Sequence, residues 1–219
     1  MRLKHICFLL CIMTFRSNIQ KTITQIFIPT YLTFGADVKS IQFTPQTVVK
    51  EFKNVLAFHQ TVKFYDYIKP NEAHLFPVLW SIKPEPRVLT MSNCGSLVNL
   101  FNLPTNWEDQ INALRSFFLR TGILILDIRF MPWTPYVLNN VCVQSDRMTL
   151  VDLALYSKKT ETYIQTYFDK LIWQIKTYLL LRDYPVILYL LHIFLYLLWV
   201  LTDLVEKIQV SIKELVSRW

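Results

Sequence analysis

The sequence has few glycines, few cysteines and few charged residues, and each shortage excludes a class of protein. Only three of its 219 residues are glycine, which argues against a fold with several glycine-rich phosphate loops. The four cysteines (Cys7, Cys11, Cys94 and Cys142) are few and scattered, which excludes a disulfide scaffold, and none lies in a zinc-like Cys-x-x-Cys pair. Charged residues make up 18% of the chain, against about 25% in an average soluble domain.

The length and composition of the chain indicate one domain, or one domain with two lobes, with a sizeable hydrophobic core. Hydrophobic residues account for 53% and aromatic residues for 15%, which excludes a disordered chain and raises the question of membrane contact. The net charge of +7 would suit nucleic acid, anionic lipid headgroups or ATP. Since the basic residues are spread out and form no nucleic-acid-binding motif, we do not expect nucleic acid as a partner.

The first fifteen residues form an apolar N-terminal segment. Arg2 and Lys4 precede the apolar run 6–13, as in the first two regions of a secretory signal. No small-x-small cleavage site follows, and the run is shorter than the about 20 residues that span a bilayer. The alternative is a first strand or helix of the core, and both interpretations stay open.

The next part of the chain predicts strands and then a helix. Residues 23–43 are rich in β-branched and aromatic residues, which predicts two or three short strands. Thr44 and Pro45 have the pattern of a helix start, followed by an apolar face at helical spacing, which predicts a helix over 46–60. A short strand over 88–91 follows after two turn signals.

A second helix and a hairpin are predicted further on. Thr105 and Glu108 form a capping-box pattern at the start of this helix, and Gly122 falls where a terminal glycine would end it. An apolar run over 123–128 contains Asp127. Two strands, 141–143 and 148–151, flank a turn, and Asp152 follows the second strand.

This order of elements and several motifs resemble the protein-kinase-like family. Residues 36–39 (ADVK) are similar to the family's V-A-I-K strand, Glu51 follows twelve residues later on the predicted helix, and 88–95 (VLTMSNCG) looks like the strand and hinge beside the adenine. The resemblance implies an α+β, bilobal fold with a small β-rich N-lobe over 16–91 and a mostly helical C-lobe over 92–219.

The resemblance also implies a set of site residues. Lys39, paired with Glu51, would hold the phosphates of ATP, and Asp127, in the place of the family's H-R-D aspartate, would be the catalytic base. Asn139 and Asp152 would bind Mg²⁺, a hard ion that prefers oxygen ligands.

The sequence departs from the family's pattern at several positions. It has no G-x-G-x-x-G, Ile125 stands where the family has the H-R-D histidine, and Ala154 stands where it has the D-F-G glycine. Twelve residues separate Asp127 from Asn139, where the family has about five. We therefore expect either an ATP-dependent phosphotransferase of low activity or an inactive, nucleotide-binding pseudokinase.

Each candidate residue also has a purely structural interpretation. Lys39 can be a solvated strand lysine, and Glu51 can pair with a neighbouring lysine. Arg129 can satisfy Asp127 without catalysis, because an unpaired buried carboxylate is costly. Asn139 can belong to a turn, where asparagine is common.

The C-terminal third is helical from Thr160 and contains the very apolar stretch 186–202. One interpretation is a transmembrane helix of about 25 Å, with Tyr184, Tyr189 and Trp199 as interface anchors; the other is a buried central helix of the C-lobe. The alternative function is therefore a non-enzymatic, membrane-anchored interaction protein. The sequence identifies no protein partner or substrate, and it admits a membrane or secretory location as well as an intracellular one.

Overall fold

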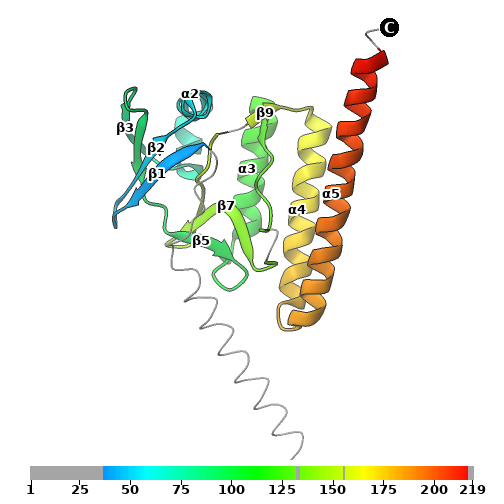
Figure 1. Ribbon diagram of the computed structural model, residues 1–219. Coiled ribbons are helices and arrows are strands. Elements are labelled where there is room, and N and C mark those ends of the chain that lie inside the picture. The colour runs from blue at the N-terminus through cyan, green and yellow to red at the C-terminus, as the bar shows by residue number, and fades with distance from the viewer. Residues whose placement is uncertain (1–36, 132–133, 155, 217–219) are drawn as a thin grey trace, which may run out of the picture. The chain divides into compact units, whose positions relative to one another are not determined.

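The computed structural model describes residues 37–131, 134–154 and 156–216, with side chains up to residue 201 except residue 199. The described part is mixed α+β with antiparallel sheets, and it belongs to one compact unit that begins at Asp37 (Figure 1). The signal-like segment 1–15 and most of the strands predicted over 23–43 lie outside the described residues.

The first sheet has four antiparallel strands in the order β1-β2-β4-β3. They are β1 (Val38–Phe43), β2 (Thr47–Phe52), β3 (Leu79–Lys83) and β4 (Val88–Ser92). The strand predicted over 88–91 is confirmed as β4, which pairs with both β2 and β3 and therefore lies inside the sheet.

The helix predicted over 46–60 is wrong in its first half, which is strand β2. The Thr44 hydroxyl accepts a hydrogen bond from the Thr47 amide at 2.9 Å, so this residue stabilises a turn between β1 and β2 rather than starting a helix. Residues 47–49 are β-branched, and Val48 and Val49 pair with both neighbouring strands. The helix α2 (Val55–Phe64) begins later, at Asn54, whose side chain accepts from the amides of Leu56 and Ala57. Glu51 therefore lies on a strand.

An aromatic cluster packs the sheet, its helix and the following segments together. The ring of Phe64, fully buried at the end of α2, lies 5.3 Å from Phe76, 5.6 Å from Phe117 and 5.6 Å from Tyr156. Phe76 follows the short helix η2 (Pro70–Leu75), and Phe117 belongs to α3 (Trp107–Thr121). These contacts hold elements from distant parts of the sequence around one core.

Helix α3 confirms the second predicted helix but not its predicted start. It ends at Gly122, which adopts a left-handed φ of 66° and donates its amide to the Phe118 carbonyl at 2.9 Å. The residue at the start is Asn106, which makes no side-chain capping bond, so the capping box of Thr105 and Glu108 does not form.

Two further antiparallel sheets follow the first. One has the order β5-β7-β8, with β5 (Ser96–Asn99), β7 (Val137–Gln144) and β8 (Arg147–Leu150); the other pairs β6 (Ile123–Ile125) with β9 (Tyr156–Lys158). The predicted hairpin is confirmed as β7 and β8, with β7 longer than expected. Its turn residues Ser145 and Asp146 have positive φ angles of 49° and 63°, as in a tight two-residue hairpin turn.

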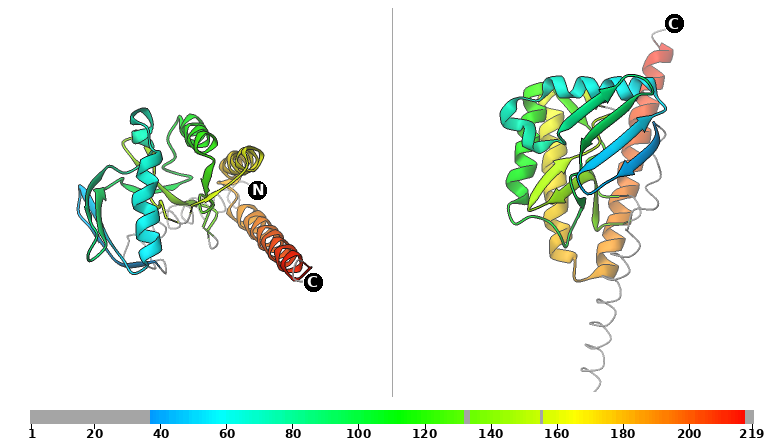
Figure 2. Two further views of the ribbon diagram at one scale, coloured as in Figure 1. Left: turned by 90° about the horizontal axis from the view of Figure 1, so that it is seen from above. Right: turned by 90° about the vertical axis from the view of Figure 1, so that its left-hand side faces the viewer.

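The chain ends in two long helices, α4 (Glu161–Leu181) and α5 (Pro185–Val216), which run side by side near the turn that joins them (Figures 1 and 2). The side chain of Thr160 caps α4, as the helical pattern from that residue predicts. Leu188 and His192 of α5 are buried, but its other side is exposed, so the prediction of a central helix buried on all sides is wrong. Among the described residues, no helix has the length and apolar character needed to cross a bilayer.

Candidate functional site

Asp127 is the centre of a cluster of hydrogen-bond donors. Its Oδ2 accepts from Asn139 Nδ2 at 2.7 Å and from Asn140 Nδ2 at 3.1 Å, and its Oδ1 accepts from Arg129 Nε at 3.0 Å. The side chain of Asp127 is 48% exposed, so the carboxylate lies at the surface. The structure thus brings the predicted base Asp127 together with the predicted metal ligand Asn139. It also pairs Asp127 with Arg129, as the non-catalytic interpretation of Asp127 predicts.

The segment after Asp127 pairs with the segment before Asn139. Asn139 donates its amide to the Arg129 carbonyl at 2.7 Å, and Met131 donates to the Val137 carbonyl at 2.9 Å. An isolated bridge between Phe130 and Leu138 lies between these bonds. The long spacing therefore does not separate the two residues, because the flanking segments pair in antiparallel fashion.

Tyr167 of α4 holds the backbone on both sides of Asp127. Its hydroxyl lies 2.7 Å from the Ile128 carbonyl oxygen and 3.1 Å from that of Leu126. Burial raises the pKa of Tyr167 well above its usual value, with a smaller contribution from the Asp127 charge, so the hydroxyl stays protonated and remains a donor. The position of the carboxylate is thus fixed by a helix more than thirty residues away in the sequence.

Asn140 connects this cluster to the segment after β8. Its backbone carbonyl accepts from the Val151 amide at 2.9 Å, while its side chain reaches Asp127. Its φ of 59° is left-handed, a conformation that asparagine tolerates better than most residues. Asp152, the other predicted metal ligand, follows Val151 directly and is 49% exposed.

Lys50, a residue that the sequence analysis did not select, is the cation beside Asp152. Its Nζ lies 3.9 Å from Asp152 Oδ1 and donates to the Val151 carbonyl at 3.3 Å. Its side chain is only 13% exposed. Lys50 belongs to β2 in the first sheet, about a hundred residues before Val151 and Asp152 in the sequence. A buried ammonium needs such partners, because leaving a charge unpaired in the interior is costly.

Lys39 and Glu51 form an ion pair, but on the other face of the sheet. Lys39 Nζ lies 2.7 Å from Glu51 Oε1, and the Ser40 hydroxyl donates to Glu51 Oε2 at 3.1 Å. The hydrogen bond from Lys39 lowers the pKa of Glu51. Because neighbouring residues of a strand point to opposite faces, Glu51 and its partner point away from the side on which Lys50 meets Asp152. The structure therefore brings Lys50, rather than Lys39, to Asp152.

The signal for Lys50 is present in the sequence. Residues 47–50 (TVVK) and residues 36–39 (ADVK) both place a valine directly before the lysine, and residues 47–50 also have a valine where 36–39 has Asp37. Assigning 46–60 to a helix hid the second match, because the lysine of that motif belongs on a strand. Lys50 becomes a candidate once β2 is recognised as a strand.

Two free thiols complete the surroundings of Lys50. Cys94 follows β4, and Cys142 lies on β7 opposite Leu97 of β5. Burial raises the pKa of Cys94, and it raises that of Cys142 to about 12, although the nearby charge of Lys50 opposes both shifts. Both thiols are therefore protonated at neutral pH and line this region as weakly polar groups.

Asp152, rather than Asp127, has a carboxylate that could take part in holding a Mg²⁺ ion beside a phosphate group. The Asp127 carboxylate already accepts three hydrogen bonds, two of them from the amide nitrogens of Asn139 and Asn140, so it offers little to a cation. Asp152 is half exposed, and Mg²⁺ is commonly bound through one or two carboxylates together with substrate phosphates. In the part of the chain that the structure describes, no three His, Cys, Asp or Glu side chains form a metal cluster.

The chain was also compared with known proteins. Neither models of protein families nor curated protein sequences give a match.

Proposed function

We propose that this chain is a divergent kinase-like protein that binds a nucleoside triphosphate, with phosphate transfer slow or absent. Lys50 would contact the phosphates, and Asp152 would hold the Mg²⁺ bound to them. The observation that carries the proposal is the contact of Lys50 with Asp152 and Val151, which joins the first sheet to the segment after β8.

The charge arrangement supports this assignment. A lysine that is 13% exposed and a carboxylate that is 49% exposed lie 3.9 Å apart, beyond a close ion pair. Both groups therefore retain capacity for a further partner of opposite charge. The ammonium has three N–H groups, and among the described residues its contacts are the Val151 carbonyl and Asp152. A phosphate oxygen would use the remaining donor, and a magnesium ion would use the carboxylate.

The order of elements supports a kinase-like arrangement of this site. A four-stranded antiparallel sheet with α2 comes first, residues 93–95 lead away from β4, and α3 precedes both Asp127 and the β7–β8 hairpin. This is the order that the resemblance implies for the two lobes, with the boundary near residue 91. In that arrangement ATP would lie beside 93–95, and its phosphates would point toward Lys50.

The state of Asp127 favours low activity. A catalytic base must accept a proton from the substrate hydroxyl, and this carboxylate already accepts bonds from Arg129 and two asparagines. Together these three bonds leave the carboxylate little capacity to accept a bond from a substrate hydroxyl. We therefore expect little phosphate transfer through Asp127.

Thermal unfolding of the full chain with and without Mg·ATP tests the proposal. A ligand present at 100 times its Kd stabilises the native state by about 2.7 kcal/mol, which raises the Tm by several degrees in a unit of this size. We expect this shift in the wild type and in Lys39→Met, and a loss of most of it in Lys50→Met and Asp152→Asn.

The two lysine variants are matched controls, because both remove one ammonium from the same sheet. No shift in the wild type at millimolar Mg·ATP would reject nucleotide binding. A shift that is lost in Lys39→Met and kept in Lys50→Met would instead restore Lys39 as the phosphate contact. If ATP binds, incubation with γ-labelled ATP then measures phosphate transfer, which we expect to be slow and further reduced in Asp127→Asn.

A further inference from the structure

One side of α5 exposes a row of apolar side chains that the proposed nucleotide site does not use. Its outer face consists of six side chains, each 53–71% exposed: Val186, Ile187, Leu190, Phe194, Leu197 and Leu201. These residues extend over 16 positions, or about 24 Å of helix. Leu180 and Tyr184, 79% and 60% exposed, continue the apolar surface across the turn from α4.

The opposite side of α5 fixes which face is outward. His192 Nδ1 lies 2.9 Å from the Tyr178 hydroxyl, and His192 Nε2 lies 3.0 Å from the Met131 carbonyl oxygen. Leu188, one turn earlier, is completely buried. With these two residues held against α4 and the segment after Asp127, the helix cannot rotate its outer face into the core without breaking buried hydrogen bonds.

Two occupants would cover such a face: a second copy of this chain or a lipid bilayer. The residues Ile187, Leu190, Phe194, Leu197 and Leu201 are spaced by three and four alternately, as in a coiled-coil seam. A coiled coil, however, has charged residues beside its seam, and a protein interface has a polar rim. Of the exposed side chains described between 186 and 201, none is charged and only Tyr189 carries a polar group.

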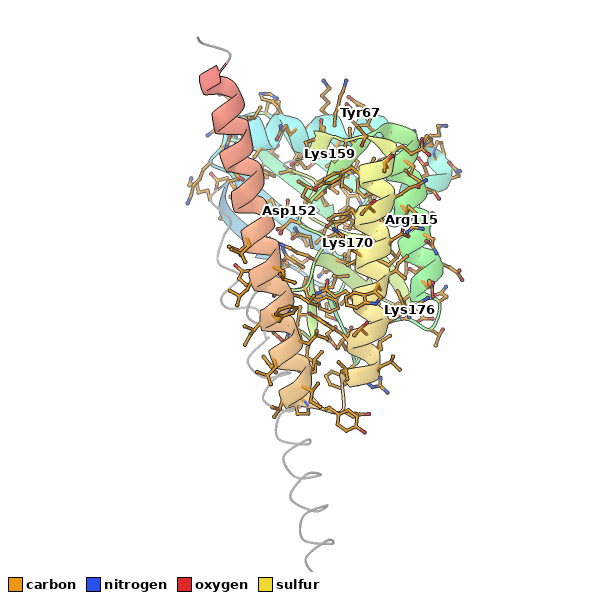
Figure 3. The ribbon with its side chains drawn as sticks, turned by 90° about the vertical axis from the view of Figure 1, so that its right-hand side faces the viewer. Tyr67, Arg115, Asp152, Lys159, Lys170 and Lys176 are labelled. Carbon is orange, nitrogen blue, oxygen red and sulfur yellow. The ribbon has the colours of Figure 1, made fainter. Side chains whose placement is uncertain are left out.

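The chemistry around the face also favours lipid. A helix that lies in a membrane interface needs a broad apolar face, and tyrosines are enriched at the level of the headgroups. Tyr184 and Tyr189 are both exposed at the start of α5. Lys159, just before the neighbouring α4, and Lys170, on it, lie on the side of the molecule that Figure 3 shows, and the chain has a net charge of +7. Lys176 of the same helix is paired with Glu108 at 2.7 Å. Anionic headgroups attract such basic residues.

We propose that the outer face of α5 binds the chain to a lipid bilayer, with the helix lying along the membrane surface. The acyl chains near the headgroups would cover the six apolar side chains, and the buried His192 side would remain against the body of the protein. This binding is independent of the nucleotide site.

Vesicle flotation of the purified full chain tests the proposal. We expect the wild type to float with vesicles of phosphatidylcholine alone and more strongly with vesicles that contain one quarter phosphatidylserine. Raising the salt to about 0.5 M should remove the difference between the two lipids but not the binding to phosphatidylcholine, because salt screens charge and does not weaken apolar burial. The variant Leu190→Glu/Phe194→Glu/Leu197→Glu should lower the bound fraction at least ten-fold.

The first sheet offers a matched control. Val78, Trp80 and Ile82 are 43–57% exposed, and the variant Val78→Glu/Trp80→Glu/Ile82→Glu adds the same three charges there. We expect this control to float like the wild type. If the α5 variant loses helical circular dichroism, the uncharged Leu190→Gln/Phe194→Gln/Leu197→Gln variant decides in its place.

Three outcomes would overturn the proposal. One is flotation that the α5 variant leaves unchanged. Another is a wild type that does not bind vesicles but sediments as a dimer that the α5 variant dissociates, which would make a second copy the occupant. The third is a monomer that binds no vesicle. None of these outcomes bears on the Mg·ATP test, so the two proposals fail separately.

Discussion

Asn140 offers a sharp test of how the Asp127 cluster is built. It combines a side-chain bond to Asp127, a backbone bond to Val151 and a left-handed φ of 59°. Three substitutions separate these contributions. Asn139→Ala removes one side-chain bond to Asp127 at a position without a positive φ. Asn140→Ala removes a similar bond at a position with a left-handed φ. Asn140→Gly removes the same bond, but glycine adopts the left-handed φ freely.

The expected magnitudes follow from the geometry. A hydrogen bond to a charged group contributes about 1.5–3 kcal/mol, but Asp127 is 48% exposed, so we take the ordinary value of about 0.5–1.5 kcal/mol for each asparagine. The left-handed conformation costs an alanine about 1–2 kcal/mol more. Asn140→Ala should therefore lower the free energy of unfolding by about 2–3 kcal/mol, and Asn139→Ala by about 1 kcal/mol.

Urea unfolding followed by circular dichroism measures these differences at constant pH and salt. We expect Asn140→Gly to be more stable than Asn140→Ala by about 1 kcal/mol, although glycine usually destabilises a chain through its unfolded state. The same order should appear in the Tm, at about 2–4 °C for each kcal/mol. If Asn140→Ala is no less stable than Asn140→Gly and Asn139→Ala, the backbone at Asn140 carries no strain and our account of the cluster is wrong.

Three further predictions concern other parts of the fold. Gly95→Ala should lower stability by at least about 2 kcal/mol, because φ is +87° and an added Cβ would lie 2.3 Å from a carbonyl oxygen of β7; urea unfolding measures this. Tyr178→Phe should cost about 1–3 kcal/mol by removing the hydroxyl that lies 2.9 Å from His192 Nδ1, and an unchanged Tm would contradict this. Because Lys39 lowers the pKa of Glu51, this ion pair stabilises the fold above about pH 4.5, and the stabilisation is lost as the pH falls further. When the free energy of unfolding is measured against pH in this acid range, Lys39→Met should show a smaller decrease than the wild type.

The local part of the fold could be predicted from the sequence because its signals act over a few residues. Gly122 ends α3 since glycine adopts the left-handed conformation without strain, and Ser145 and Asp146 form the turn between β7 and β8. The apolar run of β4 and the helix from Thr160 are likewise confirmed. The first half of the helix predicted over 46–60 was wrong because apolar residues at helical spacing also fit a strand, and pairing with β1 and β4 decided between the two.

The sequence also determined part of the candidate site. Asp127 and Asn139 were selected on residue type and order, and the structure places them 2.7 Å apart. Their spacing looked too long only because a linear sequence does not show that the segment after Asp127 pairs with the segment before Asn139. Lys50 was not selected in this way, because residues 46–60 were assigned to a helix and the lysine of the motif belongs on a strand.

Composition showed that the chain is apolar, basic and poor in glycine, and the order of residues located the apolar excess in the first fifteen residues and in the helix over 186–202. It could not decide which side of that helix meets water, because every residue type there suits both a core and an exposed apolar face. The contacts of His192 with Tyr178 and Met131 made that choice by turning one side inward. In the same way, strand alternation made Lys50 and not Lys39 the neighbour of Asp152. Residue type determines what a side chain can do, whereas only packing between distant segments determines which partner it meets.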